Sequence, residues 1–369
     1  MTLEMLKKDL LNLIGKTINI VEKRNTMPVL MNILLEADQG VLKIFATDLE
    51  VSLMDQAPCQ VSRPGKVAVS AKSLFEIAKE LAEEPIQLNR KENNWLEIRQ
   101  GKYHSKIVGI SAEEYPVFPT FSGTGFIRIP EEVLRDMIDK TLYSVSSDDT
   151  RYHLNGVFFE QLGNAGYTMV ATDGHRLSLV QKDLDSSRIM NEGQGVIIPR
   201  KGLHEIRKLL DAVKGPFEIA VEGAQLILRN ENTVLMVRLI EGKYPNYSQF
   251  IPQQLKKRIR INREAFLTSL KRVSLLANQK SKAITLTLSN GKMEIASNNP
   301  ELGDAKEEID TDYEGQDLKI GFNAKYIQDI LTSINETEVD FEINDQLSPG
   351  ILRPHNDGSY TCVVMPMRI

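Results

Sequence analysis

Alternating apolar and polar residues recur along the chain in short runs that end at turn residues, a pattern typical of half-buried β-strands. The clearest case is the stretch 166–179, GYTMVATDGHRLSL, in which β-prone residues flank the pair Asp173-Gly174. Glycine can adopt the positive φ that a tight hairpin turn needs. The pattern therefore predicts a strand, a tight turn and a second strand.

The same pattern occurs twice more. The stretch 41–53 reads VLKIFATDLEVSL, and 291–303 reads a more diverged GKMEIASNNPELG. The aligned alanines, Ala46, Ala171 and Ala296, are separated by two equal intervals of 125 residues. Equal intervals over so long a range predict three tandem copies of one domain. We place the copies at 1–124, 125–252 and 253–369.

Apolar residues at helical spacing predict two helices in each copy. The first follows a short strand within 1–18, 126–145 and 258–277. The second follows a strand in VSAKSLFEIAKELA, IIPRKGLHEIRKLLDAV and IGFNAKYIQDILTSI, and a lysine stands at the same place near its start: Lys72, Lys201 and Lys325. With about eight strands per copy, this predicts an α+β fold in which two helices pack on antiparallel sheets.

Composition favours a soluble, intracellular protein. The chain has 41% hydrophobic and 26% charged residues, and no apolar run approaches the ~20 residues of a membrane span. Only two cysteines occur, Cys59 and Cys362, far apart and outside any CxxC motif. That usage fits a reducing cytoplasm and argues against a disulfide framework.

The net charge of −5 by itself disfavours nucleic acid as a partner, because phosphate binding relies on Lys and Arg. Charge can be segregated by face, however, so the total is a weak guide. Basic residues do gather in the second helix of the second copy and around the first helix of the third copy.

Catalytic and cofactor motifs are missing from the sequence. His175 stands near Asp173, which would suit general acid–base chemistry, but no Ser or Cys nucleophile motif accompanies them. The five histidines form no HxxxH pair, and no GxxxxGK[ST] or GxGxxG motif is present. We expect a protein that is not an enzyme and that binds no cofactor and no metal.

Four sequence motifs occur in order along the chain and together point to one family: TRYHLNGVFFE, ATDGHRLSL, IPRKG before the second helix of copy two, and the terminal VVMPMRI. Together with the three repeats, the chain resembles the bacterial DNA polymerase III beta subunit, the sliding clamp, over its whole length. The resemblance implies three clamp domains per chain and a head-to-tail homodimer that forms a pseudo-sixfold ring around duplex DNA. It further implies a processivity factor that tethers the replicative polymerase alpha subunit, the clamp loader, other DNA polymerases and repair proteins through one hydrophobic groove.

The resemblance also implies site residues. Residues that it implies at the DNA are Arg24, Lys72, Tyr152, His153, Arg200 and Lys201. A partner-peptide groove is implied at Arg151, Leu154, Thr172, Gly174, His175, Arg176, Leu177, Pro245, Phe250, Val363, Val364, Met365, Pro366, Met367 and Arg368. The dimer seam is implied at Ile107, Leu275 and Leu276, with Ser105 where relatives present a bulky apolar residue.

Two other classes of function remain open at this point. One is an enzyme whose active site lies between repeats, and the other is a repeat scaffold that binds proteins without encircling DNA. A clamp stays on circular DNA and is lost from linear DNA with free ends, and neither alternative predicts that dependence.

Overall fold

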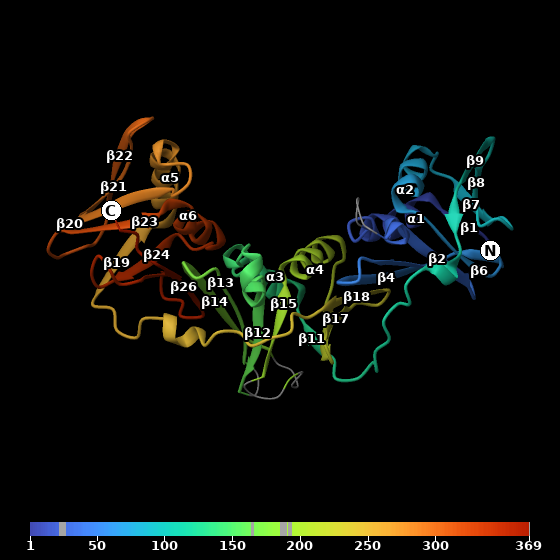
Figure 1. Ribbon diagram of the computed structural model, residues 1–369, viewed down its shortest axis with the longest axis horizontal. Helices are drawn as coiled ribbons and strands as arrows, with labels where there is room; N and C mark the ends of the chain where they lie inside the picture. Colours follow the sequence, from blue (N-terminus) through green and yellow to red (C-terminus); the bar gives the residue numbers. More distant parts are fainter. Residues whose placement is uncertain (22–26, 164–165, 185–189, 191–193, 369) are drawn as a thin grey trace. The chain divides into compact units, whose positions relative to one another are not determined.

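The structure is a computed structural model of residues 1–369, and it describes all of them except 22–26, 164–165, 185–189, 191–193 and 369 (Figure 1). Apart from these gaps, the chain divides into two compact units. Unit 1 comprises residues 1–132 and 201–239, and unit 2 comprises 133–184, 190, 194–200 and 240–368.

Unit 1 contains two antiparallel sheets. The nine-stranded sheet has the order β10 (Gly109–Ile110), β6 (Gly65–Ser70), β2 (Asn32–Asp38), β3 (Val41–Thr47), β4 (Val51–Pro58), β18 (Thr233–Arg238), β17 (Gln225–Arg229), β16 (Phe217–Glu222) and β11 (Ile127–Ile129). The five-stranded sheet has the order β5 (Gln60–Arg63), β1 (Thr2–Leu6), β7 (Pro85–Arg90), β8 (Leu96–Gln100) and β9 (Tyr103–Ile107).

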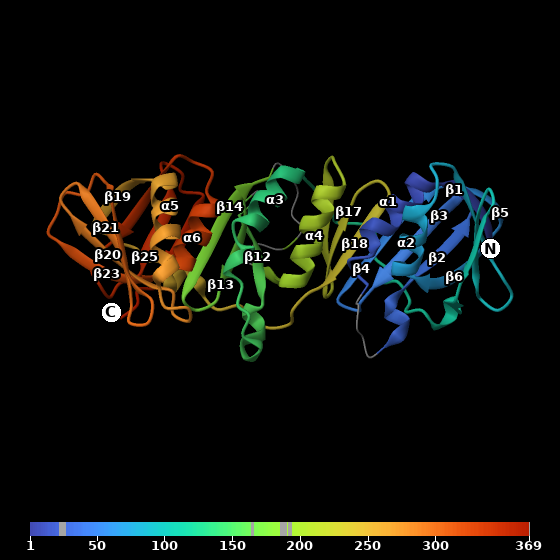
Figure 2. The ribbon, with the colours of Figure 1, turned by 90° about the horizontal axis from the view of Figure 1, so that it is seen from above.

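Pairing of β4 with β18 makes the nine-stranded sheet continuous from the first repeat into the second. Val51 lies opposite Val237, and Leu53 lies opposite Leu235. Helices α1 (Lys7–Thr17), α2 (Ala71–Glu80) and α4 (Arg200–Ala212) lie beside one another over one face of this sheet (Figure 2). The sheet joins two repeats into one unit, because the last strand of one repeat completes the sheet of the other.

Unit 2 repeats this design. Its eight-stranded sheet has the order β15 (Gly195–Pro199), β12 (Gly156–Leu162), β13 (Gly166–Thr172), β14 (Arg176–Asp183), β26 (Tyr360–Val364), β25 (Gly350–Pro354), β24 (Glu338–Ile343) and β19 (Lys257–Asn262). The four-stranded sheet has the order β22 (Gly303–Asp310), β21 (Lys292–Asn299), β20 (Ala283–Ser289) and β23 (Leu318–Asn323). The α-helices are α3 (Glu131–Asp139, mostly in this unit), α5 (Arg263–Val273) and α6 (Ala324–Ser333), and α5 packs beside α6.

Short 3₁₀ helices complete the elements. They are η1 (Pro28–Met31), η2 (Ala112–Glu114), η3 (Leu142–Ser144), η4 (Asp149–Leu154), η5 (Tyr247–Phe250) and η6 (Ser274–Leu276). Among the described residues each repeat therefore holds two α-helices, as predicted.

The predicted turn at Asp173-Gly174 is confirmed. Asp173 and Gly174 lie between β13 and β14, and Gly174 has a φ of +89°. Asn290 and Gly291 form a two-residue hairpin loop between β20 and β21, with Gly291 at +77°. Lys72, Lys201 and Lys325 each occupy the second position of their helix, also as predicted. These features depend on a few neighbouring residues, so the local sequence suffices to predict them.

Across the described ranges, the longest apolar helices fall short of what a membrane-spanning segment requires. Cys362 is buried, Cys59 is half-buried, and both are free thiols.

Candidate functional site

An apolar cluster in unit 2 gathers part of the implied peptide groove around the β14–β26 pair. Its buried members are Leu154, Val170, Leu177, Leu179, Ile197, Tyr244, Ile351 and Val363. Five half-buried side chains pack against it: Phe158, Ile240, Tyr247, Ile251 and Leu255. We call this set the groove cluster. It brings together three residues that the sequence implied, Leu154, Leu177 and Val363.

Strand alternation explains which side chains reach the groove cluster. Leu177 lies opposite Val363, so both side chains project from the same face of the sheet. Arg176 lies opposite Val364, and their side chains project from the other face. Val364 is fully buried there.

The Arg176 guanidinium is held on that other face. Nη1 lies 2.7 Å from Oδ2 of Asp329, and Nε lies 3.0 Å from Oδ2 of Asp173. The guanidinium also lies over the ring of Tyr326, 4.5 Å from its centroid, and donates to the Tyr143 carbonyl. Only the Arg176 backbone is therefore available at the groove, and a contact from its side chain to a peptide stays a prediction.

The Arg151 guanidinium lies against the backbone of Gly174. A Cβ built on Gly174 would lie 2.7 Å from Nη1 of Arg151, so the guanidinium occupies the space that a side chain would fill. Nε of Arg151 donates to Oδ2 of Asp148 over 2.9 Å. Hydrogen bonds from Thr150 foremost, and then the one from Arg151, hold the pKa of Asp148 below its ordinary value. The Arg151 guanidinium is therefore held by Asp148 and lies against the turn between β13 and β14.

Exposed apolar side chains stand at the chain's C-terminal end and at η5. Phe250 is 53% exposed and Met365 is 41% exposed, whereas Pro245 and Met367 are half-buried. The Met365 N–H donates to the His175 carbonyl over 2.9 Å, which ties the tail to the β13–β14 turn. The other implied residues lie close in sequence to these: Thr172 is buried in β13, Pro366 is half-buried, and His175 and Arg368 are exposed.

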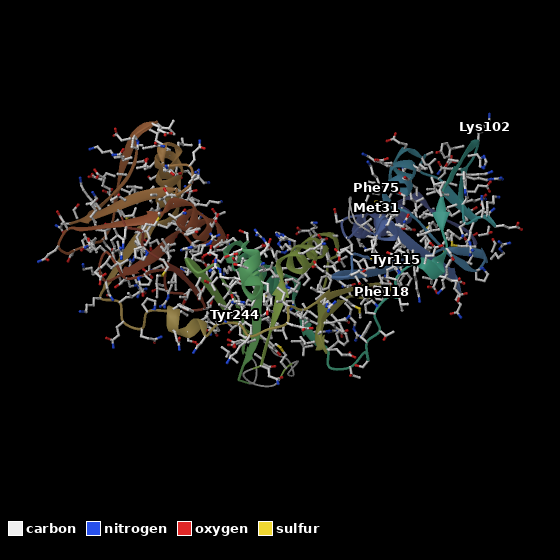
Figure 3. All side chains as sticks on the ribbon, in the orientation of Figure 1. Met31, Phe75, Lys102, Tyr115, Phe118 and Tyr244 are labelled. Atoms are coloured by element: carbon white, nitrogen blue, oxygen red, sulfur yellow. The ribbon has the colours of Figure 1, made fainter. Side chains whose placement is uncertain are left out.

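Three aromatic residues were missed by sequence reasoning: Phe158 of β12, and Tyr244 and Tyr247 of the segment between β18 and β19. The rings of Phe158 and Tyr244 stack with centroids 5.0 Å apart, and Tyr247 lies against Phe158 at 6.4 Å. Figure 3 labels Tyr244. Burial raises the pKa of the Tyr244 phenol, so it stays protonated at neutral pH. The available signal was a Tyr-Pro pair that occurs both at Tyr115-Pro116 and at Tyr244-Pro245, but such a pair does not show which way the ring points.

The residues implied at DNA do not form one cluster within either unit. In unit 1, Lys72 has a side chain that is 79% exposed, and Nζ of Lys201 lies 2.7 Å from Oδ2 of Asp48. In unit 2, Tyr152 is exposed and packs edge-on against the His153 ring, with centroids 5.7 Å apart. Arg200 is exposed at the start of α4, and Arg24 lies outside the described residues.

The residues implied at the dimer seam lie on exposed elements. Ile107 is half-buried on β9, the last strand of the five-stranded sheet. Ser105 is on the same strand, and its buried Oγ has no hydrogen-bond partner within the part of the chain that the structure describes. Leu275 is 76% exposed in η6, next to the half-buried Leu276. Outside the gaps in the description, no group of three His, Cys, Asp or Glu side chains converges as metal ligands would.

Tandem repeats of two helices on antiparallel sheets, with a groove cluster where two repeats join, define a protein of the DNA-clamp class. Family models of the DNA polymerase III beta subunit match in order: the N-terminal domain at 1–119, the central domain at 128–246 and the C-terminal domain at 248–368. The chain belongs to the family of DNA polymerase III beta subunits, the bacterial sliding clamps.

Individual relatives match the chain over all or nearly all of its length. The chain is 30% identical to a beta sliding clamp of Caulobacter vibrioides, with all of both chains covered. It is 32% identical to the beta sliding clamp of Pseudomonas aeruginosa over 95% of each chain. The crystal structure of the Pseudomonas aeruginosa DNA polymerase III subunit beta superposes with a TM-score of 0.94 at 31% identity, covering both chains fully. A Bartonella birtlesii sliding clamp bound to griselimycin has a TM-score of 0.95 at 29% identity, with both chains fully covered.

Membership confirms the predicted family and the predicted three-repeat α+β fold. It also confirms a DNA sliding clamp that works in DNA replication and is not itself an enzyme.

Proposed function

We propose that two copies of the chain close head to tail into a ring that holds duplex DNA by enclosure, with the α-helices toward the DNA. A head-to-tail interface closes only when its rotations complete a full turn, and six similar repeats would do so. The supporting observation is that β4–β18 and β14–β26 join successive repeats by equivalent strand pairing. We propose 1–124, 125–252 and 253–369 as the bounds of the three domains and the cytoplasm as the site of action.

The helix charges support weak, sequence-independent contact with DNA. Several cations of α4 are already paired with acids: Lys208 with Glu205 at 2.7 Å and Arg207 with Asp211 at 2.6 Å. Cations whose charge is partly neutralised displace few counterions from DNA, so they would let a ring slide. Lys72, Arg200 and Tyr152 are the more exposed side chains and are proposed to touch phosphates.

A loading experiment tests enclosure. The protein would be loaded onto nicked circular plasmid by a clamp loader, and the plasmid would then be linearised with a restriction enzyme. We expect co-elution with the circular DNA on gel filtration and loss after linearisation. Equal retention on both forms would contradict enclosure and would favour direct binding. No retention on either form would favour a scaffold that never encircles DNA.

We further propose that the groove cluster binds linear peptides from the replicative polymerase alpha subunit, the clamp loader, other DNA polymerases and repair proteins. Its floor is apolar, methionine at its edge adapts to varied side chains, and Arg151 offers a cation to a peptide carboxylate.

Replacement of exposed residues separates peptide binding from folding. Met365→Ala and Phe250→Ala should each weaken the binding of a fluorescent clamp-binding peptide by about tenfold. Truncating a side chain that anchors a partner lowers the binding free energy by ~1–2 kcal/mol. Leu347→Ala is the matched control, because Leu347 is an exposed apolar residue of unit 2 on the β24–β25 connection. Unchanged affinity in both groove variants would refute the assignment, whereas an equal loss in all three would indicate a non-specific surface effect.

A further inference from the structure

A hollow of about 440 Å³ lies between α1, α2 and α4 of unit 1, outside the groove cluster and the seam. One side of the hollow is formed by α1, at residues 11, 12, 15 and 16, and by residue 19 just after it. Another side is formed by Phe75 and Lys79 of α2. Leu53 of β4 and Glu205, Lys208, Leu209 and Ala212 of α4 complete it. Its volume falls within the ~300–1,000 Å³ of typical small-ligand pockets.

Gly15 lines the hollow on the α1 side. Glycine inside a helix costs roughly 0.5–1 kcal/mol relative to alanine. Steric crowding does not require glycine here, because a Cβ at this position would meet no atom within 4 Å. By contrast, a Cβ on Gly202 in α4 would lie 2.2 Å from the Val237 side chain. Packing therefore requires glycine at Gly202 but not at Gly15, where the missing side chain leaves open space.

The lining combines three chemistries. Leu11, Leu53 and Leu209 form an apolar floor, and the half-buried Phe75 adds an aromatic ring to the wall (Figure 3). Two exposed amide side chains also line the hollow, Asn12 of α1 and Asn19 just after that helix.

Lysines bring positive charge to this edge. Lys79 is exposed and makes no ion pair among the residues that the structure describes. Lys208 is exposed and paired with Glu205, and Lys16 is paired with the buried Asp55 at 2.7 Å. At least one uncompensated cation therefore lies beside the aromatic wall.

We propose that this hollow binds an unstacked base of single-stranded DNA, with Phe75 against the face of the base and Lys79 near the adjoining phosphate. An aromatic wall, an apolar floor and a basic edge are the elements by which proteins hold single strands without sequence preference. Amides at Asn12 and Asn19 can meet base edges. A base within a duplex is already stacked on both faces, so the hollow selects unpaired DNA.

This inference rests on the proposed function for the presence of DNA at the helix surface. Its test does not require enclosure, because a short linear strand reaches the hollow of an unloaded protein. A failure of the loading experiment and a failure of this one are therefore distinguishable.

The experiment measures anisotropy of a short fluorescein-labelled oligothymidine titrated with the full-length protein. A strand of equal length with only the sugar-phosphate backbone has the same charge and no bases. The wild-type protein should bind the oligothymidine at least about fivefold more tightly than the abasic strand, since base–aromatic stacking contributes ~1–3 kcal/mol per base.

Two variants remove the site in different ways. Gly15→Leu fills the hollow and adds a better helix former, and Phe75→Leu removes the ring but keeps an apolar side chain. Each should lower oligothymidine affinity at least about fivefold and leave the abasic strand unaffected. Phe118→Leu is the control: Phe118 is also half-buried in unit 1 but packs against Phe45, on the face of the nine-stranded sheet away from Leu53 (Figure 3).

The proposal is overturned if the wild-type protein binds both strands equally, or if Gly15→Leu and Phe75→Leu both bind oligothymidine like the wild type. It is also overturned if Phe118→Leu loses as much affinity as Phe75→Leu. Circular dichroism melting identifies a variant that fails to fold. If either Gly15→Leu or Phe75→Leu does not fold, the affinity of the other one tests the proposal.

Discussion

The Lys16 ammonium lies 2.7 Å from Oδ2 of Asp55, and the Asp55 carboxylate is fully buried beneath α1. The other carboxylate oxygen accepts a hydrogen bond from Oγ1 of Thr233 over 2.9 Å. This contact joins the first helix, β4 of the first repeat and β18 of the second. It therefore links the two repeats of unit 1 at the strand pair that makes their sheet continuous.

Asp55→Ala should destabilise unit 1 by ~3 kcal/mol, because it leaves the mostly buried ammonium of Lys16 without its partner. Thr233→Val should cost less, about 1.5–2 kcal/mol, because it removes one hydrogen bond to a charged carboxylate. Hydrogen exchange of the β4 and β18 backbone amides measures the loss of stability in each of these two variants. Lys66→Ala removes the exposed partner of Glu36 and should change exchange little. Similar protection in Asp55→Ala and the wild type would show that the buried pair contributes no net stability.

Glu97 predicts a dependence of stability on pH. It is buried in β8 and accepts from Lys91 at 2.8 Å, His104 at 2.8 Å and Arg99 at 3.1 Å. The Lys91 hydrogen bond foremost, with those from His104 and Arg99, holds its pKa far below the ordinary value, against the opposing effect of burial. A carboxylate with a lowered folded-state pKa stabilises the protein above its unfolded pKa of ~4.3, and that contribution is lost as the pH falls further.

In Glu97→Gln the melting temperature should therefore fall less steeply between about pH 5 and pH 3 than in the wild type. Thermal melts at stepped pH measure the slope. Glu92→Gln, an exposed carboxylate of the same hairpin, should keep the wild-type slope. Parallel curves for Glu97→Gln and the wild type would show that Glu97 does not carry this dependence.

The two helix glycines of unit 1 should respond to alanine with opposite signs. Gly15→Ala should stabilise by roughly 0.5–1 kcal/mol, because the new Cβ enters open space and alanine favours the helix. Gly202→Ala should destabilise by about 1–3 kcal/mol, because its Cβ would overlap the Val237 side chain. Chemical denaturation followed by circular dichroism measures both, and changes of equal sign would contradict the packing of α1 and α4.

Leu275 offers a test of the proposed ring. Leu275→Asp should convert the dimer to a monomer, because a carboxylate buried at an apolar seam without a partner costs several kcal/mol. Sedimentation velocity of the variant and the wild type measures the mass. Leu302→Asp also places a carboxylate at an exposed leucine of unit 2, on the β21–β22 turn, and should leave the mass unchanged. A dimeric Leu275→Asp would place the seam elsewhere.

The sequence by itself determined the repeat count, the order of strands and helices, and the turn at Asp173-Gly174, because these depend on periodicity and on neighbouring residues. Only the tertiary structure decided that Leu177 faces the groove cluster while the Arg176 side chain is held on the opposite face. It alone placed Tyr244 in that cluster and left a hollow beside Gly15. The physical reason is distance along the chain: β14 pairs with β26, and α1 lines one hollow together with α4, although the members of each pair lie far apart in the sequence. Such register and packing arise from long-range contacts that no local pattern encodes.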